Sequence, residues 1–168
     1  MDIIQLLLKE IDAESATTRK MLQRVPTEHW DWKPHEKSMS LKQLSLHVAE
    51  LPGWVAMALT TTELDFAAQP YSQPAITEHD QLMQVFEKAL EAGKSKLLQA
   101  KEEDLAPAWT LRHGEHVLMS TNKYGLIRHS ISQTIHHRAQ LGVYLRLLDI
   151  PIPGSYGPSA DENIFSGE

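Results

Sequence analysis

The sequence predicts an all-α protein: a four-helix bundle with a long crossover loop and a proline-rich C-terminal tail. Three observations predict it. Four segments repeat apolar residues at the spacing that places them on one face of an α-helix. Loops that contain proline separate the first three segments, and only a short stretch before the fourth alternates as a strand would. Four long helices in 168 residues pack most simply as one bundle, so we expect a single domain over residues 1–168.

The first two helices have recognisable ends. The first is expected over residues 2–24 and stops before Pro26, which begins an irregular loop. The second is expected over residues 40–62, because the hydroxyl of Ser40 can cap a helix that starts there. One face of this second helix carries a mostly apolar stripe: Leu41, Leu44, His47, Val48, Leu51, Trp54 and Val55.

The second half of the chain follows the same logic. Residues 65–76 contain two prolines and small polar side chains, which predicts the crossover loop. A third helix is expected over residues 77–100, and residues 104–120 predict a small hairpin or an extended loop. The fourth helix is expected over residues 121–148, since the prolines of the segment DIPIPGSYGP cannot continue it.

Composition excludes several classes of function. The formal net charge is -6, and no run of lysine and arginine is dense enough to neutralise a phosphate backbone, so we expect no nucleic-acid partner. The chain has no cysteine, which excludes a disulfide framework and a thiolate nucleophile. Any metal would therefore need histidine, carboxylate or amide ligands.

The sequence also predicts a location. The start MDIIQLLLKEID places Asp2 where a secretory signal needs positive charge, and Gln5 interrupts its apolar run. No segment approaches the roughly 18 apolar residues of a membrane span. We expect a cytoplasmic protein with no membrane partner.

Histidines on the helix faces are the main functional signal. On the last helix a predicted core stripe carries both glutamine and histidine: Leu126, Gln133, His137, Tyr144 and Leu148. His47 lies on the stripe of the second helix, so facing helices would bring it toward His137. A buried imidazole needs a partner. Two explanations stay open: hydrogen bonds from His47 to Gln133, Gln140 or Tyr144, or a bound metal ion.

Two longer segments resemble a known family. They are WDWKPHEKSMSLKQLSLHVAELPGW, residues 30–54, and IRHSISQTIHHRAQLGVYLRLLDIPIPGSYGPSADE, residues 127–162. Both are similar to the DinB/YfiT-like superfamily of four-helix-bundle metalloenzymes. In that family a histidine of the second helix and an H-x-x-x-H pair of the last helix bind a divalent metal.

The resemblance implies a ligand set for this chain. His47 takes the position of the second-helix ligand, and His137 that of the last ligand, just before Arg138. The middle position is Gln133, whose neutral amide is a weaker ligand for zinc or nickel than imidazole. The expected cofactor is therefore a divalent metal, zinc or nickel, held weakly.

Neighbouring residues have alternative roles. His129 is a possible substitute ligand, one turn before Gln133, while His136 is expected at the surface or rim of the site. Arg138 is expected to form an ion pair with an acidic residue, and Tyr156 to pack back on the bundle. Trp54 lies two turns from His47 and can wall a pocket.

Two hypotheses about function follow from the resemblance. Family relatives include metal-dependent enzymes that use low-molecular-weight thiols, which implies a thiol-dependent transferase or hydrolase-like enzyme acting on a small molecule. The departure at Gln133 favours the other hypothesis, a non-catalytic, stress-associated or small-ligand-binding bundle whose metal site has decayed. Bundles of this type often pair through helix faces, so a homodimer is among the expected partners.

Overall fold

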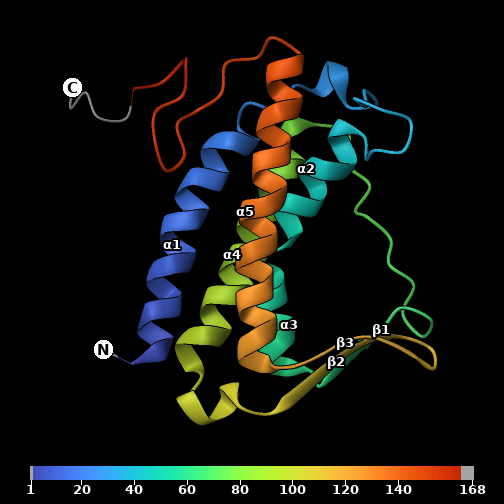
Figure 1. The fold of residues 1–168 in the computed structure, drawn as a ribbon, viewed down its shortest axis with the longest axis vertical. Coiled ribbons are helices and arrows are strands. Elements are labelled where there is room, and N and C mark those ends of the chain that lie inside the picture. Colours follow the sequence, from blue (N-terminus) through green and yellow to red (C-terminus); the bar gives the residue numbers. More distant parts are fainter. Residues whose placement is uncertain (1, 164–168) are drawn as a thin grey trace.

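A computed structural model describes residues 2–163. Met1 and residues 164–168, which the single-domain prediction over 1–168 includes, lie outside the described residues. Three long helices run side by side along the long axis of the molecule, and two shorter ones follow each other in the fourth position (Figure 1). The five are α1 (Ile3–Leu22), α2 (Leu41–Glu50), α3 (Gly53–Thr60), α4 (His79–Gln99) and α5 (Lys123–Leu147). Two short 3-10 helices span Thr27–His29 and Glu102–Leu105.

The predicted single helix over residues 40–62 is two helices, α2 and α3. Pro52 has no backbone N–H to donate to the preceding turn, so α2 ends before it. From α5, the Ser130 hydroxyl donates to the Leu51 carbonyl at 2.7 Å. A side chain at Gly93 of α4 would place its Cβ 2.5 Å from the Pro52 carbonyl oxygen, so only glycine allows this close approach. The break is therefore packed between α4 and α5.

The fold is mostly helical rather than purely all-α as predicted, because a small sheet projects from one end of the bundle (Figure 1). Strand β2 (Ala108–His113) pairs parallel with β1 (Glu63–Asp65) and antiparallel with β3 (His116–Asn122). The hairpin between β2 and β3 turns at Gly114, whose φ of 58° suits glycine. Trp109 is fully buried, and its indole N–H donates to the Thr61 hydroxyl at 3.0 Å, which anchors the sheet to the end of α3.

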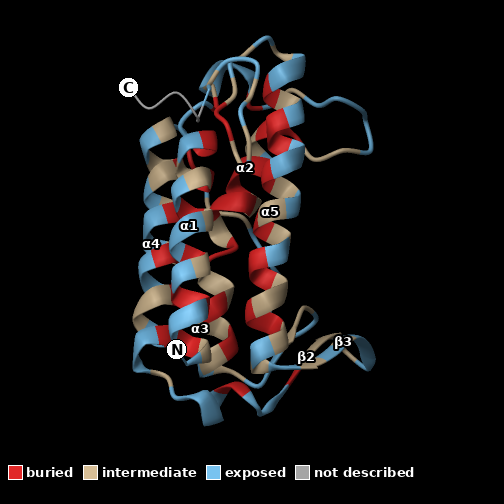
Figure 2. Cartoon of the chain, turned by 60° about the vertical axis from the view of Figure 1, so that its left-hand side comes forward, coloured by how far each residue is buried: buried red, intermediate tan, exposed pale blue. Residues whose placement is uncertain are grey.

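Buried residues gather where the long helices face one another (Figure 2). The apolar face predicted for the first helix is buried in α1: Ile4, Leu7, Leu8, Ile11, Thr18, Met21 and Leu22. In α5 the buried face is a different one: Leu126, Ile127, Ser130, Ile131, Thr134, Arg138, Leu141, Gly142 and Leu145. Because α5 packs against α1 as well as α2 and α3, most of the predicted stripe, including Gln133 and His137, lies half-buried at the edge of that face.

Residues 149–163 leave α5 and fold back beside α1 (Figure 1). Asp149 has a φ of 58°, which turns the chain at the end of the helix. The Tyr156 hydroxyl donates to the Glu14 carboxylate at 2.7 Å, and Lys20 pairs with Glu162 at 3.1 Å. Tyr156 thus returns to the bundle as predicted, although 68% of it stays exposed. Among the described residues, no helix combines the length and apolar character that crossing a membrane requires.

Candidate functional site

His47 of α2 and His137 of α5 are in contact. Their ring centroids lie 4.5 Å apart, and the ring planes meet at 78°. Both side chains are half-buried at the edge of the packed faces of the two helices. A capping box formed by Ser40 and Gln43 starts α2, and the Asn122 side chain caps α5, so both histidines stand on well-defined helices. The two histidines therefore face each other, as predicted.

Burial favours the neutral form of both imidazoles. Burial lowers the pKa of His47 to about 4, and the nearby His137 adds to this effect. Burial also lowers the pKa of His137; a hydrogen bond with Gln140 opposes the shift, and the neighbouring His136 adds to it. Neutral imidazole is the form that binds a metal ion or accepts a hydrogen bond.

Gln140 determines which nitrogen of His137 is available. The Nδ1 atom of His137 lies 2.8 Å from the Gln140 amide oxygen, which can only accept, so Nδ1 carries the proton. The Nε2 atom of His137 is left with its lone pair. The Gln140 amide nitrogen lies 3.2 Å from Nε2 of His136. The bond between His137 Nδ1 and Gln140 is of the kind that typically orients a metal-binding histidine.

The alternative in which His47 bonds to Gln133, Gln140 or Tyr144 is not found within residues 2–163. The Tyr144 hydroxyl donates instead to the Met39 carbonyl at 3.2 Å, and Gln140 is bonded to His136 and His137. Hydrogen bonding therefore satisfies His137 but does not account for His47.

Gln133 lies one turn before His137 and is half-buried. No group of three His, Cys, Asp or Glu side chains suited to a metal occurs in the described part of the chain. His129 does not complete one: it precedes His137 by two turns, about 12 Å along the helix axis, and stacks against Trp54 at 6.1 Å. His136 is exposed, with its ring 4.7 Å from that of His137, which agrees with the predicted rim position.

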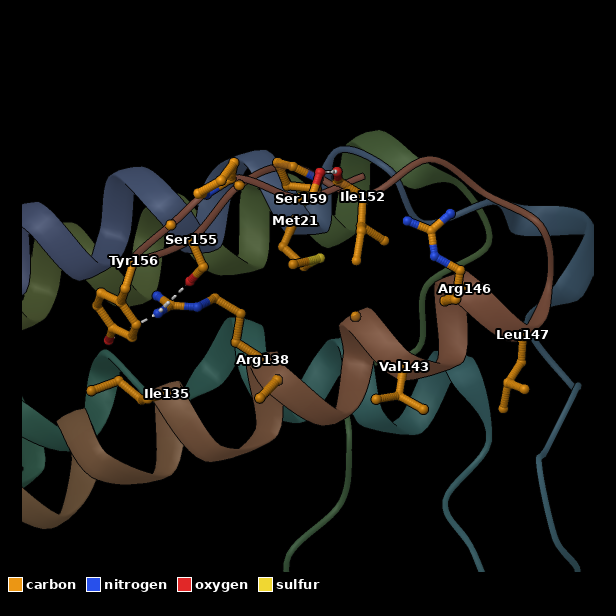
Figure 3. A pocket seen from close by; sticks show the side chains of 16 residues that line it. Met21, Ile135, Arg138, Val143, Arg146, Leu147, Ile152, Ser155, Tyr156 and Ser159 are labelled. Carbon is orange, nitrogen blue, oxygen red and sulfur yellow. Dashed lines mark hydrogen bonds between the residues drawn. The ribbon is translucent and has the colours of Figure 1, made fainter. Parts of the chain in front are cut away.

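A pocket of about 590 Å³ lies away from the histidines, between the second half of α5 and residues 152–159 (Figure 3). Arg138 lines it, and its side chain is only 2% exposed. The guanidinium pairs with Glu14 at 2.7 Å, so the predicted ion pair is confirmed. Figure 3 shows Arg138 directed toward Ser155 and Tyr156, to which it donates hydrogen bonds of 3.3 and 3.1 Å. Its charge is therefore already neutralised within the protein.

A pocket of about 530 Å³ adjoins His47. It lies between α2, α3 and residues 64–72, and Trp54 is one of its walls. Glu50, one turn after His47, lines it as well, and its carboxylate accepts a hydrogen bond from Tyr71. Sequence reasoning missed Glu50, although the spacing from His47 places both on one helix face. Nothing in the sequence of the crossover loop indicated that Tyr71 returns to this face.

Solved structures of similar fold support a shared architecture. A DinB-like protein from Bacillus subtilis is 19% identical, with a TM-score of 0.67 over 88% of this chain and 96% of the other. A protein assigned to the DinB family from Exiguobacterium sibiricum is 22% identical, with a TM-score of 0.67 over 89% and 93%. A DinB-like protein from Bacillus cereus is 17% identical, with a TM-score of 0.67 over 88% and 94%.

The sequence comparison gives the family directly. No curated protein matches the sequence. The sequence model of the DinB family matches residues 1–163. This match covers nearly the whole chain and agrees with the fold of the three structures. The chain belongs to the DinB family.

Proposed function

We propose that His47 and His137 bind a divalent metal ion, zinc or nickel, with Gln133 as a third and weaker ligand. The observation that carries the proposal is the contact of two neutral imidazoles, 4.5 Å apart, one of which lines a pocket of about 530 Å³. The free Nε2 lone pair of His137 and the Gln133 amide one turn away fit such an ion. Amide oxygen is the weakest of these ligands, so the affinity is modest.

The chemistry follows from the open positions that two or three protein ligands leave. A bound ion supplies Lewis acidity, which lowers the pKa of a coordinated thiol or water. His47 and His137 hold the ion, and Gln140 keeps His137 in the required tautomer. The pocket beside His47 holds the small-molecule substrate. The reaction class is a thiol-dependent transfer or a hydrolysis.

Gln133 supports a second candidate function. With an amide where a third imidazole would stand, and no third ionisable ligand in the described residues, the cluster resembles a metal site that has decayed. In this case the pocket beside His47 binds a small ligand without catalysis, and the histidines serve only to shape it. Metal binding separates the two functions.

Calorimetric titration of untagged protein with zinc is the decisive experiment. We expect binding of one ion, weakened by at least about tenfold in His47→Ala and in His137→Ala, because each substitution removes a strong ligand. His116→Ala removes an exposed histidine of β3 and serves as the matched control, with unchanged affinity expected. Equal zinc binding in all four proteins would exclude this metal site and leave the small-ligand function.

A further inference from the structure

The pocket beside His47 contains an acid, Glu50, that no lysine or arginine of residues 2–163 pairs with. Glu50 is half-buried and lines this pocket. Its hydrogen-bond partner is the Tyr71 hydroxyl. Burial raises the pKa of Glu50, and the Tyr71 hydroxyl bond partly offsets that rise. A carboxylate partly removed from water with no cation beside it is a costly arrangement, which a positively charged ligand would relieve.

Three aromatic side chains also line this pocket. Trp54 comes from α3, whereas Phe66 and Tyr71 come from the segment that follows β1. The faces of aromatic rings carry partial negative charge and attract cations, most strongly when the site is withdrawn from water. The pocket volume of about 530 Å³ is within the range for small organic ligands.

We propose that this pocket binds an organic ammonium group, with Glu50 as its counter-charge and Trp54, Phe66 and Tyr71 as its aromatic walls. The inference deepens the proposed function, on which it rests, by naming the substrate class of the same site. Tyr71 has two roles, since its hydroxyl donates to the Glu50 carboxylate while its ring lines one side. An anionic substrate does not suit the pocket, because Glu50 would repel it.

The Glu50 carboxylate is separate from the metal ligands. Although Glu50 follows His47 by one helical turn, it does not join His47 and His137 in a three-ligand cluster within residues 2–163. The carboxylate is therefore available to a ligand whether or not a metal is bound. Ammonium binding can consequently be measured on metal-free protein, independently of the zinc titration.

The test compares two ligands of the same shape on protein freed of metal with a chelator. Choline carries a quaternary ammonium, and its carbon isostere, the 3,3-dimethyl isomer of dimethylbutanol with a primary hydroxyl, is neutral. We expect choline to bind at least about tenfold more tightly, because only the cation gains from the carboxylate and the aromatic faces. In Glu50→Gln this preference should disappear. Glu91→Gln, which removes an exposed charge of α4, should retain it.

One further variant tests the aromatic walls separately from the charge. Trp54→Leu removes an aromatic wall without touching the charge, and we expect it to weaken choline binding while leaving dimethylbutanol binding nearly unchanged. This variant decides the matter if Glu50→Gln does not fold. Equal affinity for the two ligands, no choline binding at millimolar concentration, or a preference that survives both substitutions would overturn the inference. Choline binding by a wild-type protein that does not bind zinc would overturn the metal proposal alone.

Discussion

The carboxylate of Glu14 and the guanidinium of Arg138 lie 2.7 Å apart, between α1 and α5. The Arg138 side chain is 2% exposed and that of Glu14 is 13% exposed. Arg138 also donates to the Thr18 hydroxyl and to the Glu14 carbonyl, each at 3.1 Å. Both charges are therefore withdrawn from water and depend on each other.

Replacing Glu14 by glutamine should destabilise the protein by about 3 kcal/mol, since it leaves the Arg138 charge buried without its partner. Urea unfolding followed by circular dichroism measures the loss. As the control, Glu87→Gln removes the partner of Arg19 in a more exposed pair and should cost at most about 1 kcal/mol. Equal losses in the two variants would show that the Glu14–Arg138 pair contributes no more to stability than the exposed pair.

Acidification of the metal-free protein should lower its free energy of unfolding between pH 6.5 and about 4. The folded state holds the pKa of His47 at about 4, against an ordinary value of 6.5, so in this window the unfolded state binds a proton that the folded state does not. The contribution of the neutral ring is complete above pH 6.5 and is lost as the pH falls. At about pH 5 the loss is at most about 2 kcal/mol.

Urea unfolding at neutral pH and at about pH 5 in wild type and His47→Gln isolates this effect, because carboxylates titrate alike in both proteins. The variant should lose less stability on acidification. If both lose the same amount, protonation of His47 does not contribute to the acid sensitivity.

Replacing Gln133 by histidine should strengthen metal binding. The new imidazole would stand four residues before His137 on the same helix face. Zinc or nickel should then raise the thermal midpoint by more than it does in the native protein, because the ion binds the folded state. The gain should be largest above about pH 6.5, where free histidine is neutral.

The control for Gln133→His is Ser132→His, which adds a histidine at an exposed position of the same turn. This second variant should not increase the thermal shift. If the native protein already shows the full shift, Gln133 is not the weak ligand of the site.

Replacing Gly93 by alanine should destabilise the protein by about 1–3 kcal/mol. A Cβ at this position would lie 2.5 Å from the Pro52 carbonyl oxygen and 3.2 Å from the Val55 side chain, so α4 must move away from the α2–α3 break. Thermal unfolding of Gly93→Ala beside Ala92→Ser, an exposed neighbour, measures the difference. A more stable Gly93→Ala would show that the helices separate without strain.

The helices were predictable where apolar residues keep a clear helical period along one face. The α1 stripe predicted from spacing alone is buried in the structure. The break at Pro52 had a visible signal, a proline within an apolar run, but the periodicity continues across it from Leu51 to Val55 and hid it. Strand β1 has only three residues, and its backbone bonds come from β2, which lies far along the chain. No local pattern could indicate it.

The candidate site was predictable in part. Stripe spacing and the family resemblance both predicted that His47 and His137 lie close together, and the structure places them in contact. The orientation of α5 was not accessible from spacing, because its apolar residues face several partner helices at once. For this reason Arg138, expected as an ordinary ion pair, turned out to be the most deeply buried charge of the described residues. Tyr71 reaches Glu50 only through the path of the crossover loop.

Residues 149–163, which follow α5, are attached to the bundle by weaker contacts than those that hold the helices together. Its ties to the bundle include the exposed ion pairs Lys20–Glu162 and Arg146–Asp161, which contribute little free energy in water. Local opening of residues 152–162 should thus require far less energy than global unfolding. In a hydrogen-exchange experiment the amides of Ile152 and Gly154, bonded to carboxylates of that segment, should exchange early while the centres of α1 and α5 remain protected. The same opening would expose Met21 and Arg138. A protease that cuts within this segment should leave the helical bundle folded.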